Sequence, residues 1–314
     1  MLVQQRGTAY SVHAPAKLNL FFEVRQRRRD GFHEIETLMI PVSLYDTLYF
    51  RSAPRALSFD ESPTFGESPS AIRFSCRDLT GGFAAADPHR AIPTDASNLV
   101  VRAIELLRER SGVETSAEVE LVKRIPAAAG LGGGSSDAAA ALLAANAAWS
   151  LGWSRSRLGQ LAAELGSDVP FFLGRGAAVC RGRGEIVEPV AGLGDWHAVV
   201  VTPPVGLSTP EVYAQVEIPS QPRSVDTYIE KLRGAASRVA PQPYNTLESA
   251  ALKLTPWIDR LRSEVQRTGC RSQAMSGSGS SYFGIYPHAR AARRAARQLQ
   301  GRGLGGVFVV RSAA

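Results

Sequence analysis

The clearest pattern of apolar and polar positions lies on both sides of the turn "RQRRRDG" at residues 25–31. "YSVHAPAKLNLFFEV" precedes this turn and "FHEIETLMIPVSLYDTLYF" follows it, and both stretches carry β-branched and aromatic residues in partial alternation. This alternation is typical of strands, so the sequence predicts a long hairpin. "SAEVELVKRIP" also alternates and predicts a strand that runs into a glycine-rich loop.

Helical spacing of apolar residues predicts three helices in the first half of the chain, at residues 98–110, 137–151 and 155–165. Ser135 or Ser136 is a good N-cap for the second of them. Beyond this the pattern predicts strands near Ile186 and Val199, helices from Asp226, Leu247 and Trp257, the strand "SYFGIY", an arginine-rich helix and the strand "GVFVV". A second layer of helices and strands is expected to begin within residues 176–185.

Residues 52–93 are rich in Pro, Ser, Gly and Asp, with short apolar islands such as "AIRFSC". Such composition predicts strands joined by an extended, mobile loop.

The composition is that of a globular protein of one large or two smaller domains, with 314 residues of which 44% are hydrophobic. Cys76, Cys180 and Cys270 show no CxxC spacing, so neither a disulfide framework nor a zinc site is indicated, and we expect a reducing cytoplasm. No signal pattern and no uninterrupted apolar stretch of 18 residues is present, so neither export nor a membrane span is expected.

The net charge is +7, and almost all the basic residues are arginines. The run "RAARRAARQLQGR" spaces its arginines three or four apart, as on a helix whose solvated face covers an apolar stripe. Interleaved aromatic residues and known nucleic-acid motifs are both missing, so no nucleic-acid partner is expected. A positive surface suits an anionic small substrate.

Four of the five positions from Gly130 to Gly134 are glycine, directly before an alanine-rich helix. Glycine reaches positive φ without strain and lets another group approach the backbone. The free N–H groups at a helix N-terminus bind anions, so this loop is a candidate phosphate site. A tight connection would look the same, and neither the P-loop nor the dinucleotide signature is present.

Four further stretches contain residue types that could carry chemistry. "APAKLNLFF" places Lys17 and Asn19 on one face of a strand among apolar residues, "DGFHE" contains His33, and "GSDVPFF" contains Asp168. "MSGSGSSYFGIY" is a second Gly/Ser loop before a strand. Taken singly, each has a structural explanation: a lysine reaching solvent, a structural histidine, a helix-capping carboxylate, a flexible turn.

The order "PAKLNL", "GLGGGSSDAA", "GSDVPFF" and "SGSGSS" resembles the GHMP small-molecule kinases. The resemblance implies an α+β fold of two domains: an ATP-binding domain like ribosomal protein S5 domain 2 at residues 1–178, and a ferredoxin-like domain on the substrate side at residues 179–314. ATP and substrate would lie between them, and Mg²⁺ would accompany ATP through ligands that the motif does not specify. Either a monomer or a homodimer is compatible with it.

Within these kinases, "APAKLNLFFEV", "RDGFHEIETLMIPVSLYDTL" and "SDVPFF" are similar to members that phosphorylate the 2-hydroxyl of a methylerythritol unit carrying a cytidine diphosphate group, in the non-mevalonate isoprenoid pathway. Phe32 stands where those members commonly carry Tyr, and residues 53–94 are longer than expected.

By motif match, the resemblance assigns Lys17 and Asp168 to catalysis, flanking the accepting hydroxyl. Asn19, Phe32 and His33 would face the cytidyl end, and Tyr213 would stack on the cytosine. Asn98 would lie near the adenine. The phosphates of ATP would be held by a loop of Pro126, Gly130, Leu131, Gly132, Gly133, Gly134, Ser135 and Ser136.

Two other functions stay open at this point. One is a GHMP kinase for homoserine, mevalonate or a sugar, against which "GFHE" and its basic turn argue. The other is a non-catalytic ligand sensor on the same fold, against which the presence of both Lys17 and Asp168 argues.

Overall fold

The predicted hairpin forms the centre of the first sheet. In the computed structural model, which describes residues 1–53, 72–81, 87, 90–234 and 242–313, β2 (Ala9–Arg27) pairs antiparallel with β3 (His33–Ala53). The sheet runs in the order β1-β2-β3-β5-β4, with β1 (Val3–Arg6), β5 (Ser116–Lys123) and β4 (Ile72–Asp78). β6 (Ala178–Arg181) pairs with β3 and with β7 (Ile186–Pro189), and β9 (Tyr244–Asn245) pairs with β2.

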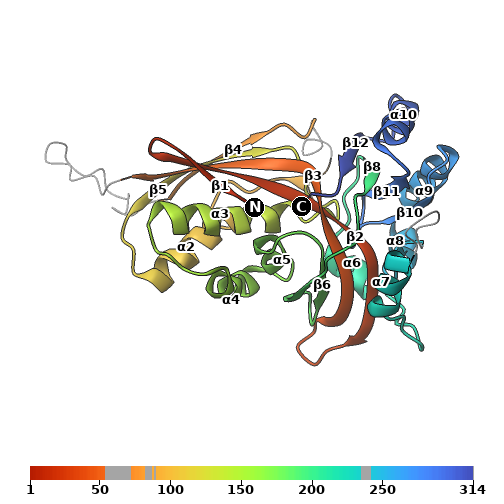
Figure 1. The fold of residues 1–314 in the computed structure, drawn as a ribbon, viewed down its shortest axis with the longest axis horizontal. Helices are drawn as coiled ribbons and strands as arrows, with labels where there is room; N and C mark the ends of the chain where they lie inside the picture. Colours follow the sequence, from red (N-terminus) through yellow and green to blue (C-terminus); the bar gives the residue numbers. More distant parts are fainter. Residues whose placement is uncertain (54–71, 82–86, 88–89, 235–241, 314) are drawn as a thin grey trace, which may run out of the picture.

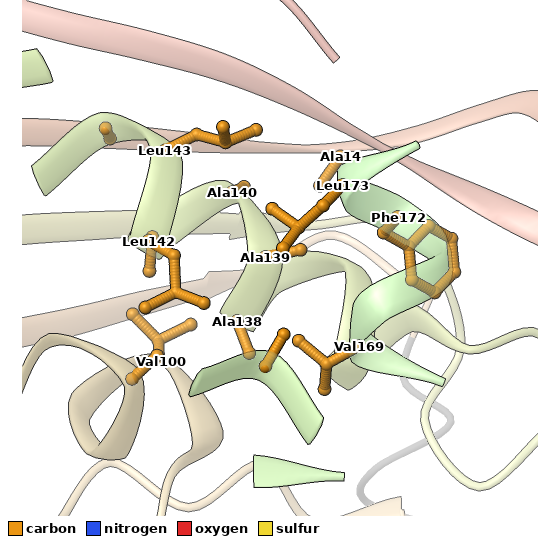
Figure 2. Packing of buried hydrophobic residues seen from close by; sticks show 14 of the residues in the cluster. Ala14, Val100, Ala138, Ala139, Ala140, Leu142, Leu143, Val169, Phe172 and Leu173 are labelled. Atoms are coloured by element: carbon orange, nitrogen blue, oxygen red, sulfur yellow. The ribbon is translucent and has the colours of Figure 1, made fainter. Parts of the chain in front are cut away.

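Four helices cover one face of this sheet, as Figure 1 shows: α2 (Leu99–Ser111), α3 (Gly133–Ala148), α4 (Arg155–Leu165) and α5 (Val169–Leu173). α3 is buried on nearly all sides, and its alanines have side chains small enough to let sheet and helices approach closely. In Figure 2, Ala138 to Ala140 lie among Val100 of α2, Val169 and Leu173 of α5 and Ala14 of β2. The alanine-rich run is therefore a core helix that fixes the position of its own N-terminus.

The second sheet has four antiparallel strands in the order β10-β11-β8-β12: β10 (Ser272–Met275), β11 (Tyr282–Tyr286), β8 (His197–Thr202) and β12 (Gly306–Arg311). Side chains alternate across β8, so that Val199 and Val201 join one apolar cluster and Ala198 and Val200 another. The first cluster includes residues of α8 (Glu248–Leu254), α9 (Trp257–Arg267) and α10 (Ala289–Leu299), and the second includes β2 and β3. The second sheet is thus packed between its helices and the hairpin, with α6 (Thr209–Ala214) and α7 (Val225–Gly234) nearby (Figure 1).

These elements confirm the predicted α+β fold, the hairpin, and the helices at 98–110 and 155–165. The arginine-rich helix is α10, which exposes its arginines and buries Ala291, Ala292, Ala295 and Ala296. None of the helices in the described part of the chain has the length and apolar character that a bilayer span requires.

One predicted helix differs from the observed one in both of its bounds and in its cap: the observed helix ends at Ala148. The helix expected at 137–151 begins at Gly133 and is capped by Gly132, so Ser135 and Ser136 lie inside its first turn and neither is the N-cap. The helix starts early because Gly132 adopts the left-handed conformation, which ends the loop sooner.

The division of the chain at 178/179 stays a prediction. β6 and β7, which follow that position, pair within the first sheet. Of the loop predicted within residues 52–93, β4 is described, whereas 54–71, 82–86 and 88–89 lie outside the described residues.

Candidate active site

Lys17 and Asp168 both line a cavity of about 900 Å³. Lys17 Nζ lies 3.7 Å from Asp168 Oδ2 and donates a hydrogen bond to Asn19 Oδ1 at 2.6 Å. Asp168 immediately precedes α5, but its side chain makes no capping hydrogen bond. The carboxylate therefore remains directed at Lys17, and the structural explanation of Asp168 as a helix cap does not hold.

The orientation of Asn19 is fixed from behind. Its amide nitrogen donates to Thr37 Oγ1 at 2.8 Å, and Thr37 Oγ1 donates in turn to the carbonyl of Phe21. With the amide nitrogen occupied, the Asn19 oxygen faces Lys17. Asn19 itself is not among the residues that line the cavity, and its predicted contact with the cytidyl end stays a prediction.

Burial disfavours the charged form of Lys17 and lowers its pKa, and the nearby Asp168 carboxylate partly opposes this shift. Lys17 is 3% exposed. The pair thus places a buried ammonium group in the cavity wall, where its field on a bound ligand is weakly screened.

The glycine-rich loop lies directly against Lys17, whose backbone N–H donates to the carbonyl of Leu131 at 2.9 Å. Gly130 and Gly132 have positive φ, of 71° and 69°. A Cβ on Gly130 would lie 2.0 Å from the carbonyl oxygen of Ser276, and one on Gly132 would lie 2.9 Å from Phe172. Both positions therefore require glycine for packing as well as for backbone conformation.

α3 supplies the N–H groups that the predicted phosphate site needs. The N–H of Ser136 donates to the carbonyl of Gly132 and closes the first turn, so Gly133, Gly134 and Ser135 precede any acceptor within the helix. These three residues line the cavity, whereas Ser136 does not. The N–H groups of Gly133, Gly134 and Ser135 therefore lie at the cavity without an acceptor in their own helix, whereas that of Ser136 is used within the helix.

The second Gly/Ser loop, residues 276–281, packs against the glycine-rich loop. Ser276 Oγ donates to the carbonyl of Gly130 at 2.9 Å, and the N–H of Ser281 donates to the carbonyl of Ala129 at 3.1 Å. Asn245, which no motif singled out, donates to the carbonyls of Met275 and Gly277. The two loops form one wall of the cavity, built from both sheets.

Aromatic residues gather elsewhere in the cavity. The rings of His33 and Tyr213 lie 4.9 Å apart between centroids, and the Arg183 guanidinium lies 4.8 Å from the centroid of the Phe32 ring. Burial, and secondarily the Arg27 cation, lowers the pKa of His33 and favours its neutral form. Tyr213 thus packs against His33 with its ring tilted, and the half-exposed ring of Phe32 contacts the Arg183 guanidinium.

Asn98 caps α2: its Oδ1 accepts from the N–H of Val100 at 2.9 Å, and its Nδ2 donates to the carbonyl of Pro93 at 2.6 Å. Both ends of its amide are thus engaged within the protein. The predicted site residues that line the cavity are Lys17, Phe32, His33, Asn98, Pro126, Gly130, Leu131, Gly132, Gly133, Gly134, Ser135, Asp168 and Tyr213.

Comparison with known proteins decides the family. The model of the GHMP kinases N terminal domain matches residues 98–176, and that of GHMP kinases C terminal matches residues 222–303. The chain is 38% identical over 292 residues to the 4-diphosphocytidyl-2-C-methyl-D-erythritol kinase of Pelotomaculum thermopropionicum, covering 91% of this chain and 92% of the relative. The corresponding kinase of Nocardioides sp. is 38% identical over 300 residues, 93% of each chain.

The chain belongs to the 4-diphosphocytidyl-2-C-methyl-D-erythritol kinase family.

The solved structures agree. A crystal structure of 4-(cytidine 5'-diphospho)-2C-methyl-D-erythritol kinase matches with a TM-score of 0.76 at 36% identity, covering 97% of this chain and 99% of the other. Homoserine kinase from Cytophaga hutchinsonii shares the fold, with a TM-score of 0.67 at 20% identity and coverage of 100% and 97%. The protein is thus a small-molecule kinase with the predicted GHMP architecture, and ATP is the phosphate donor of such kinases.

Sequence analysis missed a buried ionic cluster beneath the glycine-rich loop. Lys123 contacts Asp46 and lies 2.8 Å from Asp137 Oδ2, and all three side chains are 4% exposed or less. Asp46 Oδ1 also accepts from the N–H groups of Arg124 and Ile125 at 2.5 and 2.8 Å, which holds the chain as it leaves β5. A Cβ on Gly133 would lie 2.7 Å from Lys123 Nζ, so the cluster supports the start of α3.

Arg183 was also missed, although it lines the cavity beside Phe32. The available signal was weak in each case. Lys123 is one of only four lysines, and Asp137 directly follows the two serines of the motif. Neither position reveals that the two side chains pair with each other.

Proposed function

We propose that the protein transfers the γ-phosphoryl group of ATP to the 2-hydroxyl of 4-diphosphocytidyl-2-C-methyl-D-erythritol, a step of the non-mevalonate isoprenoid pathway. The observation that carries this proposal is the Lys17–Asp168 pair, which shares one cavity with a helix N-terminus of bare backbone and with an aromatic, cationic group of residues. The names and similarity of the relatives support the choice of substrate.

Asp168 acts as the base in this proposal. Phosphoryl transfer depends mainly on in-line positioning and on stabilising charge. The Asp168 side chain is one-third exposed, faces the cavity and can accept the hydroxyl proton.

Lys17 stabilises the charge that develops on the accepting oxygen and the moving phosphoryl group. Its position is set by Asn19 on one side and Asp168 on the other. Because the ammonium is buried, it meets the reacting atoms with little competition from water.

The phosphates of ATP bind at the N–H groups of Gly133, Gly134 and Ser135, where the helix dipole of α3 is positive. When bound, Mg²⁺ neutralises charge on these phosphates. In the first turn of α3, Ser136 Oγ and Asp137 Oδ1 are both buried without a hydrogen-bond partner in the described part of the chain. They fit a magnesium ion, which commonly takes one or two protein oxygens and completes its shell with phosphates and water.

His33, Tyr213 and Phe32 offer ring surfaces for the cytosine, and Arg183 and Arg27 offer charge for the diphosphate. Phe32 provides stacking surface but lacks the hydroxyl of a tyrosine. We place the reaction in the cytoplasm, which suits three free cysteines. We propose a monomer or a homodimer.

A panel of acceptors with labelled ATP tests the proposal and separates it from its rivals. We expect label to enter the cytidyl methylerythritol substrate, with homoserine, mevalonate and galactose left unlabelled. Transfer to one of the other acceptors would assign a different GHMP kinase. Binding of ATP without transfer to any acceptor would favour a ligand sensor, and a change in the mobility of DNA or RNA at physiological salt would contradict the absence of a nucleic-acid partner.

A further inference from the structure

Arg90 is a fully buried arginine that no motif singled out. It is 1% exposed, and it lies where the first domain meets the second sheet. Its Nη2 donates to the carbonyls of Pro203 and Val205 at 3.0 and 2.8 Å, and to Ser280 Oγ at 3.1 Å. A single guanidinium nitrogen therefore binds two segments that are more than 70 residues apart in the chain.

The segment that follows Arg90 forms part of the cavity wall. Ala91, Ile92 and Pro93, which we call the donor wall, all line the cavity. The carbonyl of Pro93 accepts from Asn98 Nδ2, and Leu99 lies 3.6 Å from where a Cβ of Gly134 would stand. The donor wall is thus at the phosphate-loop end of the cavity.

The partners of Arg90 are held independently of it. Pro203 directly follows β8, and Ser280 Oγ donates to the carbonyl of Val205 at 2.7 Å. Thr202 Oγ1 and Ser281 Oγ, one residue away on each side, are hydrogen-bonded at 2.7 Å. The hydrogen-bond acceptors of Arg90 are therefore fixed by the second sheet, and Arg90 connects the donor wall to that sheet.

A second contact at the same junction points the same way. Asp87 Oδ2 accepts from the N–H of Gly206 at 2.5 Å, and the N–H of Arg90 donates to the carbonyl of Asp87 at 2.9 Å. A Cβ on Gly206 would lie 3.1 Å from Asp87 Oδ2, so glycine at 206 permits this close approach. Asp87 and Arg90 thus both bind the loop that follows β8.

We infer that Arg90 is a positioning residue for the nucleotide: by fastening the donor wall to the second sheet, it sets the shape of the ATP end of the cavity without touching the reacting atoms. This inference rests on the proposed function for the assignment of that end to ATP. We expect that lysine does not replace Arg90, because its flexible side chain ends one bond short of the Nη2 position that donates to both carbonyls and the hydroxyl.

Binding measurements on Arg90→Gln and Arg90→Lys test the inference, with Arg294→Gln on the exposed face of α10 as the matched control. Calorimetry is done below every melting temperature, with an unreactive ATP analogue and separately with cytidine diphosphate. We expect both Arg90 variants to bind the ATP analogue about tenfold more weakly than wild type, since a small displacement of the cavity wall lowers affinity. Their affinity for cytidine diphosphate should stay within about twofold of wild type, because the aromatic residues proposed to bind it belong neither to the donor wall nor to the loop that Arg90 binds. Arg294→Gln should change neither dissociation constant.

Kinetics add a readout that a purely structural role would not move. The KM for ATP should rise with kcat within about threefold, and millimolar guanidinium should restore ATP binding to Arg90→Ala. Unchanged ATP affinity in a folded Arg90→Gln, or equal weakening of both ligands, would overturn the inference.

If the Arg90 variants do not fold, Ser280→Ala tests the inference instead, since it removes one hydrogen-bond acceptor of Arg90 and keeps the arginine. A lower affinity for the ATP analogue with unchanged affinity for cytidine diphosphate supports the inference, and unchanged affinity for the ATP analogue overturns it. A wild-type protein that binds the ATP analogue but phosphorylates no cytidyl substrate would refute the proposed function, and the binding comparison at Arg90 would still stand.

Discussion

Lys17 and Asp168 approach to 3.7 Å, yet they differ sharply in exposure, since the lysine side chain is 4% exposed and the aspartate 33%. The cation is thus part of the protein interior, whereas the carboxylate faces the space that a substrate would fill. This asymmetry suits an ammonium that stabilises charge beside a carboxylate that must reach a hydroxyl group.

Lys17→Met should strongly reduce turnover while leaving the protein folded. The variant removes the cation that stabilises the moving phosphoryl group, so we expect kcat to fall by about a hundredfold or more. Burial already disfavours the charged lysine, as its lowered pKa indicates, and Asp168 can be solvated in its absence. The melting temperature at pH 7 should therefore stay close to that of wild type; a large fall would mean that Lys17 serves mainly to hold the fold.

Gly134→Ala isolates the contact between phosphate and backbone. A Cβ at this position would meet only Leu99, at an ordinary distance of 3.6 Å, and alanine favours a helix over glycine. We expect an unchanged or higher melting temperature together with ATP affinity at least about tenfold weaker, because the methyl group blocks the approach of phosphate.

Calorimetry with an unreactive ATP analogue checks this, and Gly159→Ala on α4 is the control, since a Cβ there would meet nothing within 4 Å. Normal ATP binding by Gly134→Ala would show that the bare backbone is only a connection between β5 and α3.

Tyr213→Ala should selectively lower the affinity for the cytidyl substrate. Its ring packs on His33 at 4.9 Å, so the variant removes one stacking surface and frees the imidazole. Base-aromatic stacks contribute roughly 1 to 3 kcal/mol in nucleic-acid complexes, which corresponds to one or two orders of magnitude in affinity for cytidine diphosphate. ATP affinity should stay unchanged; weakening of both ligands would indicate general unfolding. Phe32→Tyr, which adds a hydroxyl at a half-exposed ring, should be neutral or mildly favourable.

Asp137→Asn should change how stability depends on pH. In the metal-free protein, burial raises the pKa of Asp137 to about 8, although the Lys123 ammonium opposes this shift. This is well above the value of about 3.9 in an unfolded chain, so between these pH values the folded state binds more protons than the unfolded state. The free energy of unfolding of wild type therefore falls as pH rises through this window, and the variant lacks this fall.

Urea midpoints at pH 5, 7 and 9 measure the effect, and the stability of Asp137→Asn relative to wild type should increase toward pH 9. A constant difference across this range would show that Asp137 does not titrate there. Asp46→Asn is the contrasting variant: it removes the carboxylate that binds Lys123 and two backbone N–H groups, and it should cost about 3 to 5 kcal/mol.

Periodicity and local propensity predicted the hairpin, the helices at 98–110 and 155–165, and three strands of the second sheet, β8, β11 and β12, because each depends on residues close in sequence. β10 was not predicted. The start of α3 was predicted four residues late, because the serines looked like caps while the loop actually ends at Gly132. Only tertiary contacts reveal that this conformation is fixed, with Ser276 against Gly130 and Phe172 against Gly132.

The candidate site divides in the same way. Motifs indicated Lys17, Asp168 and the glycine loop, and the structure brings them together in one cavity. Lys123, Asp137 and Arg90 act through partners far away in sequence, and an isolated Lys, Asp or Arg in a sequence does not indicate what it pairs with. Asn19 was placed on the correct face, but its contact with Lys17 became visible only with the structure.

Phosphorylation of 4-diphosphocytidyl-2-C-methyl-D-erythritol by wild type and by Asp168→Asn, followed by mass spectrometry and phosphorus NMR, tests the central claim most directly. The account predicts that wild type adds one phosphoryl group at the 2-hydroxyl. Asp168→Asn, which keeps the shape of the side chain but loses the charge that accepts the proton, should be slower by about a hundredfold or more with nearly unchanged ATP affinity. Absence of the phosphorylated product from wild type, or near-normal turnover by Asp168→Asn, would contradict the account.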